Sequence, residues 1–288
     1  MEIQELRELD PGERAEVRSR YAEVYFPEPV LEPVWYGRRE HTRIDGRKAI
    51  IDQKSENVFG ICSDQYKIVP FEDVVSLVEK TVTQITSFGE IKVKPTTYAA
   101  GARLRVNIGF PDKKISIVKG DNIVPKIEIL SSLDLSTLLK GMFGAFQLKC
   151  SNGMGVWKTF QKYSKKHLQN LHIGELANSI NEGLSLFGTQ AQLWKEWGNT
   201  KITRGMYDEL WTSLPFSPAE KEKIEALPEI GTRLLIPVAL KSNDLDLWSL
   251  NSVLTQFATH EVTSELRRID LEPKIARAME MTYEKTIH

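Results

Sequence analysis

The sequence predicts an α+β protein with an antiparallel sheet and a covering helix in the N-terminal half, followed by a mainly helical C-terminal half. Apolar and polar residues alternate along Leu104–Ile108, which is typical of a half-buried strand. Valines recur at helical spacing in Phe71–Phe88. Most of the chain beyond Gly155 has the patterns of helices. These three observations set the fold class.

The N-terminal segment is predicted to combine a short helix with an extended arm. Residues 12–25 have an amphipathic pattern that Pro11 precedes and Pro27 ends. Phe26–Val34 contains three prolines, which lack an N–H donor and disfavour helix in the preceding residue. This arm either reaches over a neighbouring surface or subunit, or packs as a linker on its own domain.

Short β-rich runs separated by turn residues follow the arm. Three runs between Lys48 and Phe71 predict a hairpin or a small meander. After the helix, four runs between Ile91 and Leu130 add strands, with glycines and Asp in their turns. A further apolar run, Gly141–Cys150, leads into a glycine-rich turn.

Six helices are predicted in the C-terminal half. Their ranges are 155–170, 174–197, 203–213, 217–227, 246–260 and 263–283. The fourth has a strong start, with Ser217 as N-cap, Pro218 at N1 and Glu220 at N3. The apolar run 234–240 is either a late strand or a buried loop. The predicted organisation is a helix and arm (1–44), an α+β core (45–170) and a helical region (171–288).

Bulk properties exclude several classes of protein. The 288 residues carry a net charge of −1, which excludes a histone-like polycation, and the composition is that of a globular protein. The acidic N-terminus lacks the apolar core of a signal peptide, and no run of about eighteen apolar residues appears. We therefore expect a cytoplasmic protein (host cytoplasm if it is viral) with no membrane partner.

No catalytic motif is recognisable. Zinc-protease, P-loop, dinucleotide-binding and nucleophile-elbow motifs are absent from the sequence. Cys62 and Cys150 permit one disulfide, but free buried thiols are favoured. The turn at 152–155 is a plain tight turn or a phosphate cradle without the lysine of a nucleotide site. The sequence thus predicts a non-enzymatic protein without catalytic residues, metal or cofactor.

The strongest functional pattern is a basic window. No acidic residue occurs between Asp134 and Glu175, and the window holds six lysines: Lys140, Lys149, Lys158, Lys162, Lys165 and Lys166. On a helix over 156–171, the last four would form a stripe on one face with Tyr163 on its flank. Such a stripe suits a phosphate backbone, although it is also compatible with a solvated helix face.

A second basic cluster interleaves arginines with aromatic residues. Its members are Trp35, Tyr36, Arg38, Arg39, His41, Arg43, Arg47 and Lys48, diluted by Glu40 and Asp45. Arginine stacked on aromatic rings is a common contact to single strands. Arg103 and Arg105 would extend this surface if they face outward.

Acidic residues gather elsewhere in the chain. Residues 1–32 contain nine acidic residues and four arginines, hence −5, and residues 206–230 contain six acidic residues and two lysines, hence −4. Oppositely charged patches on one chain suit head-to-tail self-association, so we expect a homo-oligomer. Scattered surface charge is the alternative interpretation.

Three segments resemble a phage- and plasmid-borne protein family of unknown function. They are VFGICSDQYKIVPFEDVVSLVE, GAFQLKCSNGM with the lysine- and histidine-rich stretch after it, and LWSLNSVLTQFATHEV. The resemblance covers roughly residues 45–280. The residues that match its signatures are Cys150, Asn152, Gly153, His167, Asn251, Thr255 and His260. The segment Ser131–Ser136 departs from the acidic, Gly-containing pattern of the family.

The resemblance implies a role in the biology of mobile elements, since such genes serve recombination, replication or counter-defence. We expect a DNA-binding protein, with single-stranded DNA favoured, that acts in strand annealing or as a recombination accessory. The alternative is a counter-defence protein that inhibits a host restriction or defence complex through protein–protein binding.

Overall fold

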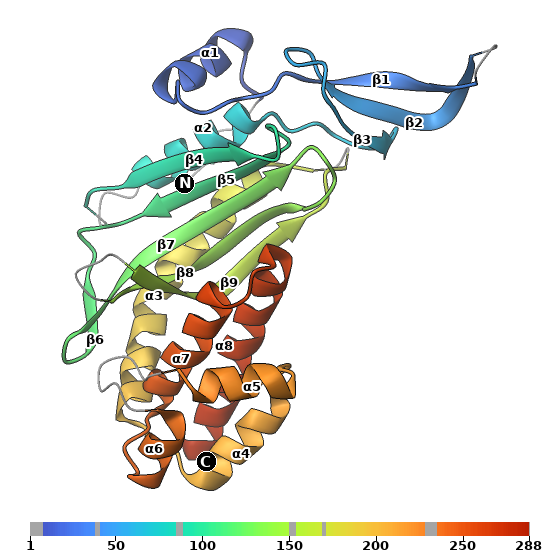
Figure 1. The fold of residues 1–288 in the computed structure, drawn as a ribbon. Coiled ribbons are helices and arrows are strands. Elements are labelled where there is room, and N and C mark those ends of the chain that lie inside the picture. The colour runs from blue at the N-terminus through green and yellow to red at the C-terminus, as the bar shows by residue number, and fades with distance from the viewer. Residues whose placement is uncertain are drawn as a thin grey trace. The chain divides into compact units, whose positions relative to one another are not determined.

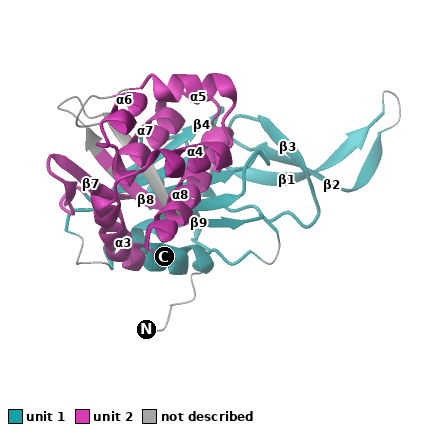
Figure 2. Cartoon of the chain, turned by 90° about the horizontal axis from the view of Figure 1, so that it is seen from below, with its two compact units in different colours: residues 1–110, 127–142, 162–183 teal, residues 111–126, 143–161, 184–288 magenta. Residues whose placement is uncertain are grey.

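The computed structural model has the α+β architecture that the sequence predicts (Figure 1). It describes residues 8–37, 41–84, 89–149, 154–168, 171–227 and 235–287. Two compact units make up the chain (Figure 2). Unit 1 comprises residues 1–110, 127–142 and 162–183, and unit 2 comprises residues 111–126, 143–161 and 184–288. Neither unit is a contiguous stretch of sequence.

Unit 1 begins with a helix and a small sheet. Helix α1 (Pro11–Arg20) is followed by an antiparallel sheet in the order β1 (Pro29–Tyr36), β2 (Thr42–Asp52) and β3 (Val58–Ser63). The predicted extended arm is thus extended, as part of the hydrogen-bonded strand β1. Helix α2 (Phe71–Thr83) follows and buries its valines.

Helix α1 is attached to α2 by ion pairs. Arg14 bonds Asp73 at 2.8 Å, and Arg18 bonds Glu72 at 2.5 Å. Glu72 is fully buried, and Arg20 adds a bond to Glu79 at 2.8 Å. Arg14, Arg18 and Arg20 of the acidic N-terminal segment therefore serve internal contacts.

The larger of the two sheets has six strands. Its order is β4–β5–β7–β8–β9, and β6 pairs with β7. The strands are β4 (Lys92–Tyr98), β5 (Arg103–Gly109), β6 (Ile115–Val118), β7 (Asp121–Ser132), β8 (Leu139–Lys149) and β9 (Met154–Lys165). The alternation predicted in β5 is confirmed, because Leu104, Val106 and Ile108 are fully buried and the residues between them are half-buried.

The remaining elements are helical. They are α3 (Gly174–Asn199), α4 (Arg204–Ser213), α5 (Pro218–Glu225), α6 (Ile236–Lys241), α7 (Leu247–His260) and α8 (Glu265–Ile287). Ser217 caps α5 in the predicted capping box with Glu220. Within the part of the chain that the structure describes, no helix combines the length and apolar character needed to cross a membrane.

Two predicted elements are wrong. The range 155–170, predicted as a helix, contains most of strand β9 instead. Its valine, threonine and aromatic residues favour strand, and pairing with β8 satisfies its backbone. The run 234–240, predicted as a strand or buried loop, contributes α6, where Pro237 occupies the first turn and needs no N–H partner.

The carboxylate of Asp52 forms hydrogen bonds with residues on both sides of the base of the β1–β2 hairpin. This carboxylate is fully buried and accepts hydrogen bonds from the Tyr25 hydroxyl, from Ser55 Oγ at 2.6 Å and from the Glu28 backbone N–H at 2.7 Å. Although burial raises the pKa of a carboxyl group, these donors, with the Lys54 N–H, lower the pKa of Asp52 to about 2. The ionised form is therefore the one that fits the site.

We predict that Asp52→Asn destabilises the protein by about 2 kcal/mol, because the amide turns a donor toward groups that need an acceptor. Urea unfolding at neutral pH measures this change. Asp45→Asn removes an exposed carboxylate from the same strand and is expected to stay within about 0.5 kcal/mol of the parent. Equal stability of the two variants would contradict the role of Asp52.

Candidate nucleic-acid interface

The far end of the β1–β2 hairpin presents two aromatic rings to solvent. Strand β3 pairs with β2 only from Arg47 to Ile51, so the hairpin beyond that point has two strands (Figure 1). Trp35 is 55% exposed and Tyr36 is 61% exposed. Rings of this size are more often largely buried, so we treat this end of the hairpin as a candidate interface.

An arginine lies beside one of these rings. Trp35 and Arg43 are direct cross-strand partners, which places their side chains on the same face of the hairpin. Arg43 is exposed and has no ion pair among the residues that the structure describes. We call Trp35, Tyr36, His41 and Arg43 the hairpin-end surface. The predicted Arg38 and Arg39 lie outside the described residues.

The four lysines of the basic window do not form the predicted stripe. Lys158, Lys162 and Lys165 lie in strand β9, and Lys166 follows it, so the helical period on which the stripe depended is absent. The side chains of Lys158 and Lys162 lie outside the described residues. Lys165 bonds Glu175 at 3.0 Å, and Lys166 is exposed.

Tyr163 is buried rather than placed on the flank of a basic face. Its side chain is 9% exposed, and burial raises the pKa of its hydroxyl to about 12. Its ring is therefore covered by protein, and a base cannot stack on it without rearrangement.

A row of polar residues on β4 and β5 was not foreseen as a unit. Lys92 and Lys94 are exposed, and Arg103 and Arg105 lie opposite Tyr98 and Thr96 on the paired strand. The two guanidinium groups lie 6.0 and 5.7 Å from the Tyr98 ring centre. The period-two spacing of Lys92, Lys94, Thr96 and Tyr98 was the signal in the sequence for this row.

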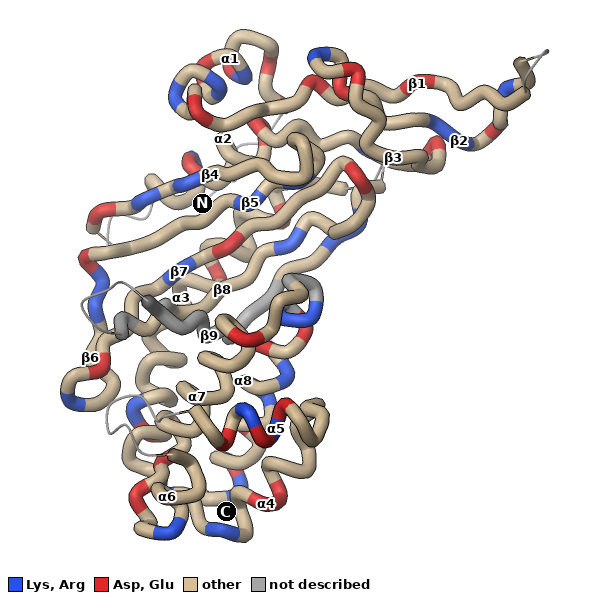
Figure 3. The backbone as a smooth tube through the Cα atoms, viewed as in Figure 1, with Lys and Arg blue, Asp and Glu red and all other residues tan. Residues whose placement is uncertain are grey.

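The arginines of this row are already paired. Arg103 bonds Asp134 at 2.6 Å, and Arg105 bonds Glu128 at 2.8 Å. Glu128 is buried. These pairs satisfy the arginines within unit 1, and Lys92 pairs with Glu90 at 3.4 Å. The exposed Lys94 therefore carries the available positive charge of the row; Figure 3 shows basic residues along β4 and β2.

His167, one of the signature residues, is a core histidine. It is 5% exposed, its ring stacks on Tyr66 with centroids 5.6 Å apart, and its Nε2 lies 3.5 Å from Ser131 Oγ. Burial lowers the pKa of His167 to about 4. Ser131 is fully buried, so the Ser131–His167 pair is inaccessible to a substrate and serves packing.

Two signature segments meet at a buried carboxylate in unit 2. Asp121 Oδ2 accepts a hydrogen bond from Trp248 Nε1 at 2.6 Å and another from the Gln147 side-chain amide. Gln147 belongs to the segment GAFQLKCSNGM and Trp248 to the segment LWSLNSVLTQFATHEV. All three side chains are at most 9% exposed. The segments therefore converge on a structural network.

The other signature residues differ in their exposure. Asn251 and Thr255 are buried in α7, and Thr255 Oγ1 donates to the Asn251 carbonyl at 2.8 Å. His260 is exposed in the last turn of the same helix. The predicted residues Cys150, Asn152 and Gly153 lie outside the described residues.

Among the described residues, no group of three His, Cys, Asp or Glu side chains is arranged to hold a metal ion. Cys62 is a buried free thiol, and burial raises its pKa. It donates to the Lys48 carbonyl at 3.5 Å. Its position within the small sheet explains it as a packing residue.

Comparison with known proteins gives one match. The family model described as Domain of unknown function (DUF932) matches residues 58–281. No curated protein and no solved structure matches the chain. The match begins at β3, so the hairpin-end surface precedes it, whereas the lysines of β9 and the signature residues lie inside it.

We predict that the burial of His167 makes the protein less stable in mild acid. Its folded pKa of about 4 lies below the unfolded value, so the unfolded chain takes up the proton first, and stability falls as the pH drops from about 6.5 to about 4. Because of His167, the free energy of unfolding is expected to be about 2 kcal/mol lower at pH 5 than at pH 7. Urea unfolding at both values measures it.

The matched variant is His167→Gln, which does not titrate in this range. Its stability should change less between pH 7 and pH 5 than that of the parent protein, whatever its absolute stability. An equal change in both proteins would show that His167 is not the group responsible.

Proposed function

The chain belongs to this family of unknown function, and we propose that it is a non-enzymatic nucleic-acid-binding protein of a phage or plasmid, with single-stranded DNA as the favoured ligand. The observation that carries the proposal is the exposure of Trp35 beside its cross-strand partner Arg43, with the exposed Tyr36 next to it in the strand on the opposite face. Aromatic rings stack on unpaired bases, and arginine contacts phosphate or stacks on the same bases.

The chemistry of this surface favours single strands over duplex. Bases in a duplex are already stacked on their neighbours, whereas an unpaired base offers both faces to a ring. Contacts of this kind tolerate any sequence, because every base has a π-face. A role in strand annealing or as a recombination accessory fits a surface that holds bases without selecting them.

Charges outside the hairpin would add affinity without adding specificity. Lys92 and Lys94 of β4 are exposed in unit 1, and Lys158, Lys162, Lys165 and Lys166 remain predicted phosphate contacts. Each phosphate contact releases counterions, so binding should weaken steeply with salt. Self-association into a homo-oligomer would multiply these weak contacts along one strand.

We predict that replacing both rings, Trp35→Ala with Tyr36→Ala, weakens binding of a single-stranded oligodeoxythymidine of about 30 nucleotides by at least about tenfold, since each stacked base contributes about 1–3 kcal/mol. Fluorescence anisotropy at fixed salt measures this loss. The matched control, Trp35→Phe with Tyr36→Phe, keeps the rings and should retain most of the affinity. Unchanged affinity in the alanine variant would refute the hairpin-end surface.

The contribution of charge is tested separately. Arg43→Glu should weaken binding and reduce the salt dependence, whereas Lys241→Glu reverses an exposed charge on α6 and should do neither. Light scattering of the same samples reports whether DNA binding accompanies assembly.

Inhibition of a host defence complex through protein–protein binding is the second candidate function. Val58 and Ile61 of β3 are 62% and 53% exposed, and exposed apolar residues on a small sheet suit a protein partner. We predict that under this function a host complex is retained from lysate after nuclease treatment, and that Val58→Asp with Ile61→Asp releases it. Retention that depends on nucleic acid would instead support the first proposal.

A further inference from the structure

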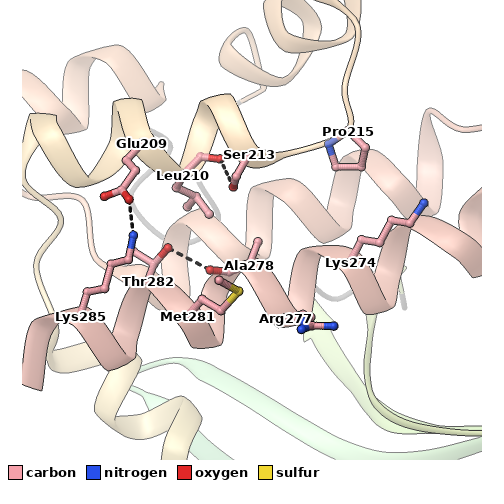
Figure 4. Close-up of a pocket in the computed structure, with 10 residues that line it drawn as sticks. All are labelled: Glu209, Leu210, Ser213, Pro215, Lys274, Arg277, Ala278, Met281, Thr282 and Lys285. Atoms are coloured by element: carbon pink, nitrogen blue, oxygen red, sulfur yellow. Dashed lines mark hydrogen bonds and ion pairs between the residues drawn. The ribbon is translucent and has the colours of Figure 1, made fainter.

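Unit 2 contains a groove between helices α4 and α8 that neither proposal uses. Its volume is about 440 Å³, within the range of small-molecule sites. Helix α4 contributes Glu209, Leu210 and Ser213, and Pro215 follows it (Figure 4). The opposite wall is one face of α8.

The α8 wall is continuous. Its lining positions are 274, 277, 278, 281, 282 and 285, which follow the three- and four-residue steps of a single helix face. They span twelve residues, or about 16 Å of helix. The groove is therefore elongated along α8.

The middle of the groove is apolar. Leu210, Ala278 and Met281 line it, and Met281 is 52% exposed. The two hydroxyls there are already used, because Thr282 Oγ1 donates to the Ala278 carbonyl at 2.9 Å and Ser213 Oγ donates to the Leu210 carbonyl at 2.7 Å. An occupant of this part would meet hydrocarbon rather than hydrogen-bond donors.

The two ends of the groove differ in charge. At one end an ion pair between Glu209 and Lys285 spans from α4 to α8 (Figure 4). At the other end lie Lys274, which bonds Asp270 at 2.6 Å, and Arg277. Arg277 is exposed and has no ion pair among the described residues. The Glu209–Lys285 ion pair thus neutralises one end of the groove, and the Arg277 guanidinium group at the other end can contact an anion.

We propose that this groove binds a small amphiphilic organic anion, whose apolar body lies along Leu210, Ala278 and Met281 and whose carboxylate or similar head contacts Arg277. A single anionic head matches Arg277, which has no ion pair in the part of the chain that the structure describes, and an apolar body matches the middle of the groove. A long helical peptide would have to displace the Glu209–Lys285 bridge, whereas a ligand with one head leaves it in place. The proposal is independent of the hairpin-end surface, which belongs to unit 1.

Dodecanoate is the probe, and methyl NMR of the full-length protein labelled in its six methionines is the readout. Met281→Leu assigns the Met281 signal. We expect dodecanoate to shift this signal saturably, and dodecylamine, which has the same chain with a positive head, to bind at least about tenfold more weakly. No saturable shift with dodecanoate, or equal binding of both probes, would overturn the proposal.

Two charge reversals complete the test. Arg277→Glu should weaken dodecanoate binding by about tenfold or more, and the matched exposed Lys241→Glu should leave it unchanged. Circular dichroism checks that both variants fold. If an acidic helical peptide shifts the Met281 signal and dodecanoate does not, the groove is a protein-docking site and the proposal is wrong.

Discussion

The hairpin that carries the candidate interface depends on one buried carboxylate. Asp52 ends β2, and it accepts hydrogen bonds from Tyr25, from Ser55 and from the backbone just before β1. A buried charge is tolerated only when donors surround it, so this network fixes where β1 begins and where β2 ends. The register that begins with Pro29 opposite Asp52 continues to Pro33 opposite Lys48, and an irregularity after Pro33 then shifts it so that Trp35 lies opposite Arg43. The hairpin-end surface therefore depends on this irregularity as well as on the network at the base.

Unit 2 also contains a buried carboxylate that accepts hydrogen bonds, and it joins distant segments of the chain. Asp121 joins the start of β7 to Gln147 in β8 and Trp248 in α7. These partners come from segments about a hundred residues apart that both resemble the family signatures. The signature residues His167, Asn251 and Thr255 are likewise buried. Of the signature residues that the structure describes, these three belong to the packing of the domain, and only His260 is exposed.

The basic window shows how a functional pattern misleads when its secondary structure is wrong. Lysines at 158, 162, 165 and 166 fit one helix face, but the same stretch contains Val156, Thr159 and aromatic residues that favour strand. Lysine spacing alone does not distinguish a helix from a strand, whereas these residues and the pairing of β9 with β8 both favour the strand. By contrast, Trp35 and Arg43 were recognised as candidates from composition alone, and the hairpin register brings them together.

The sequence by itself determined the fold class, the alternating strand β5, most helix boundaries and the capping of α5. Each of these depends on the spacing of apolar residues or on helix-capping residues within a short stretch of chain. Only the tertiary structure decided that 154–165 is a strand, that Tyr163 is buried and that Arg105 is paired with Glu128. Those outcomes depend on partners distant in the chain. The groove between α4 and α8 belongs to the same class, since its walls come from helices separated by about sixty residues and their packing creates the site.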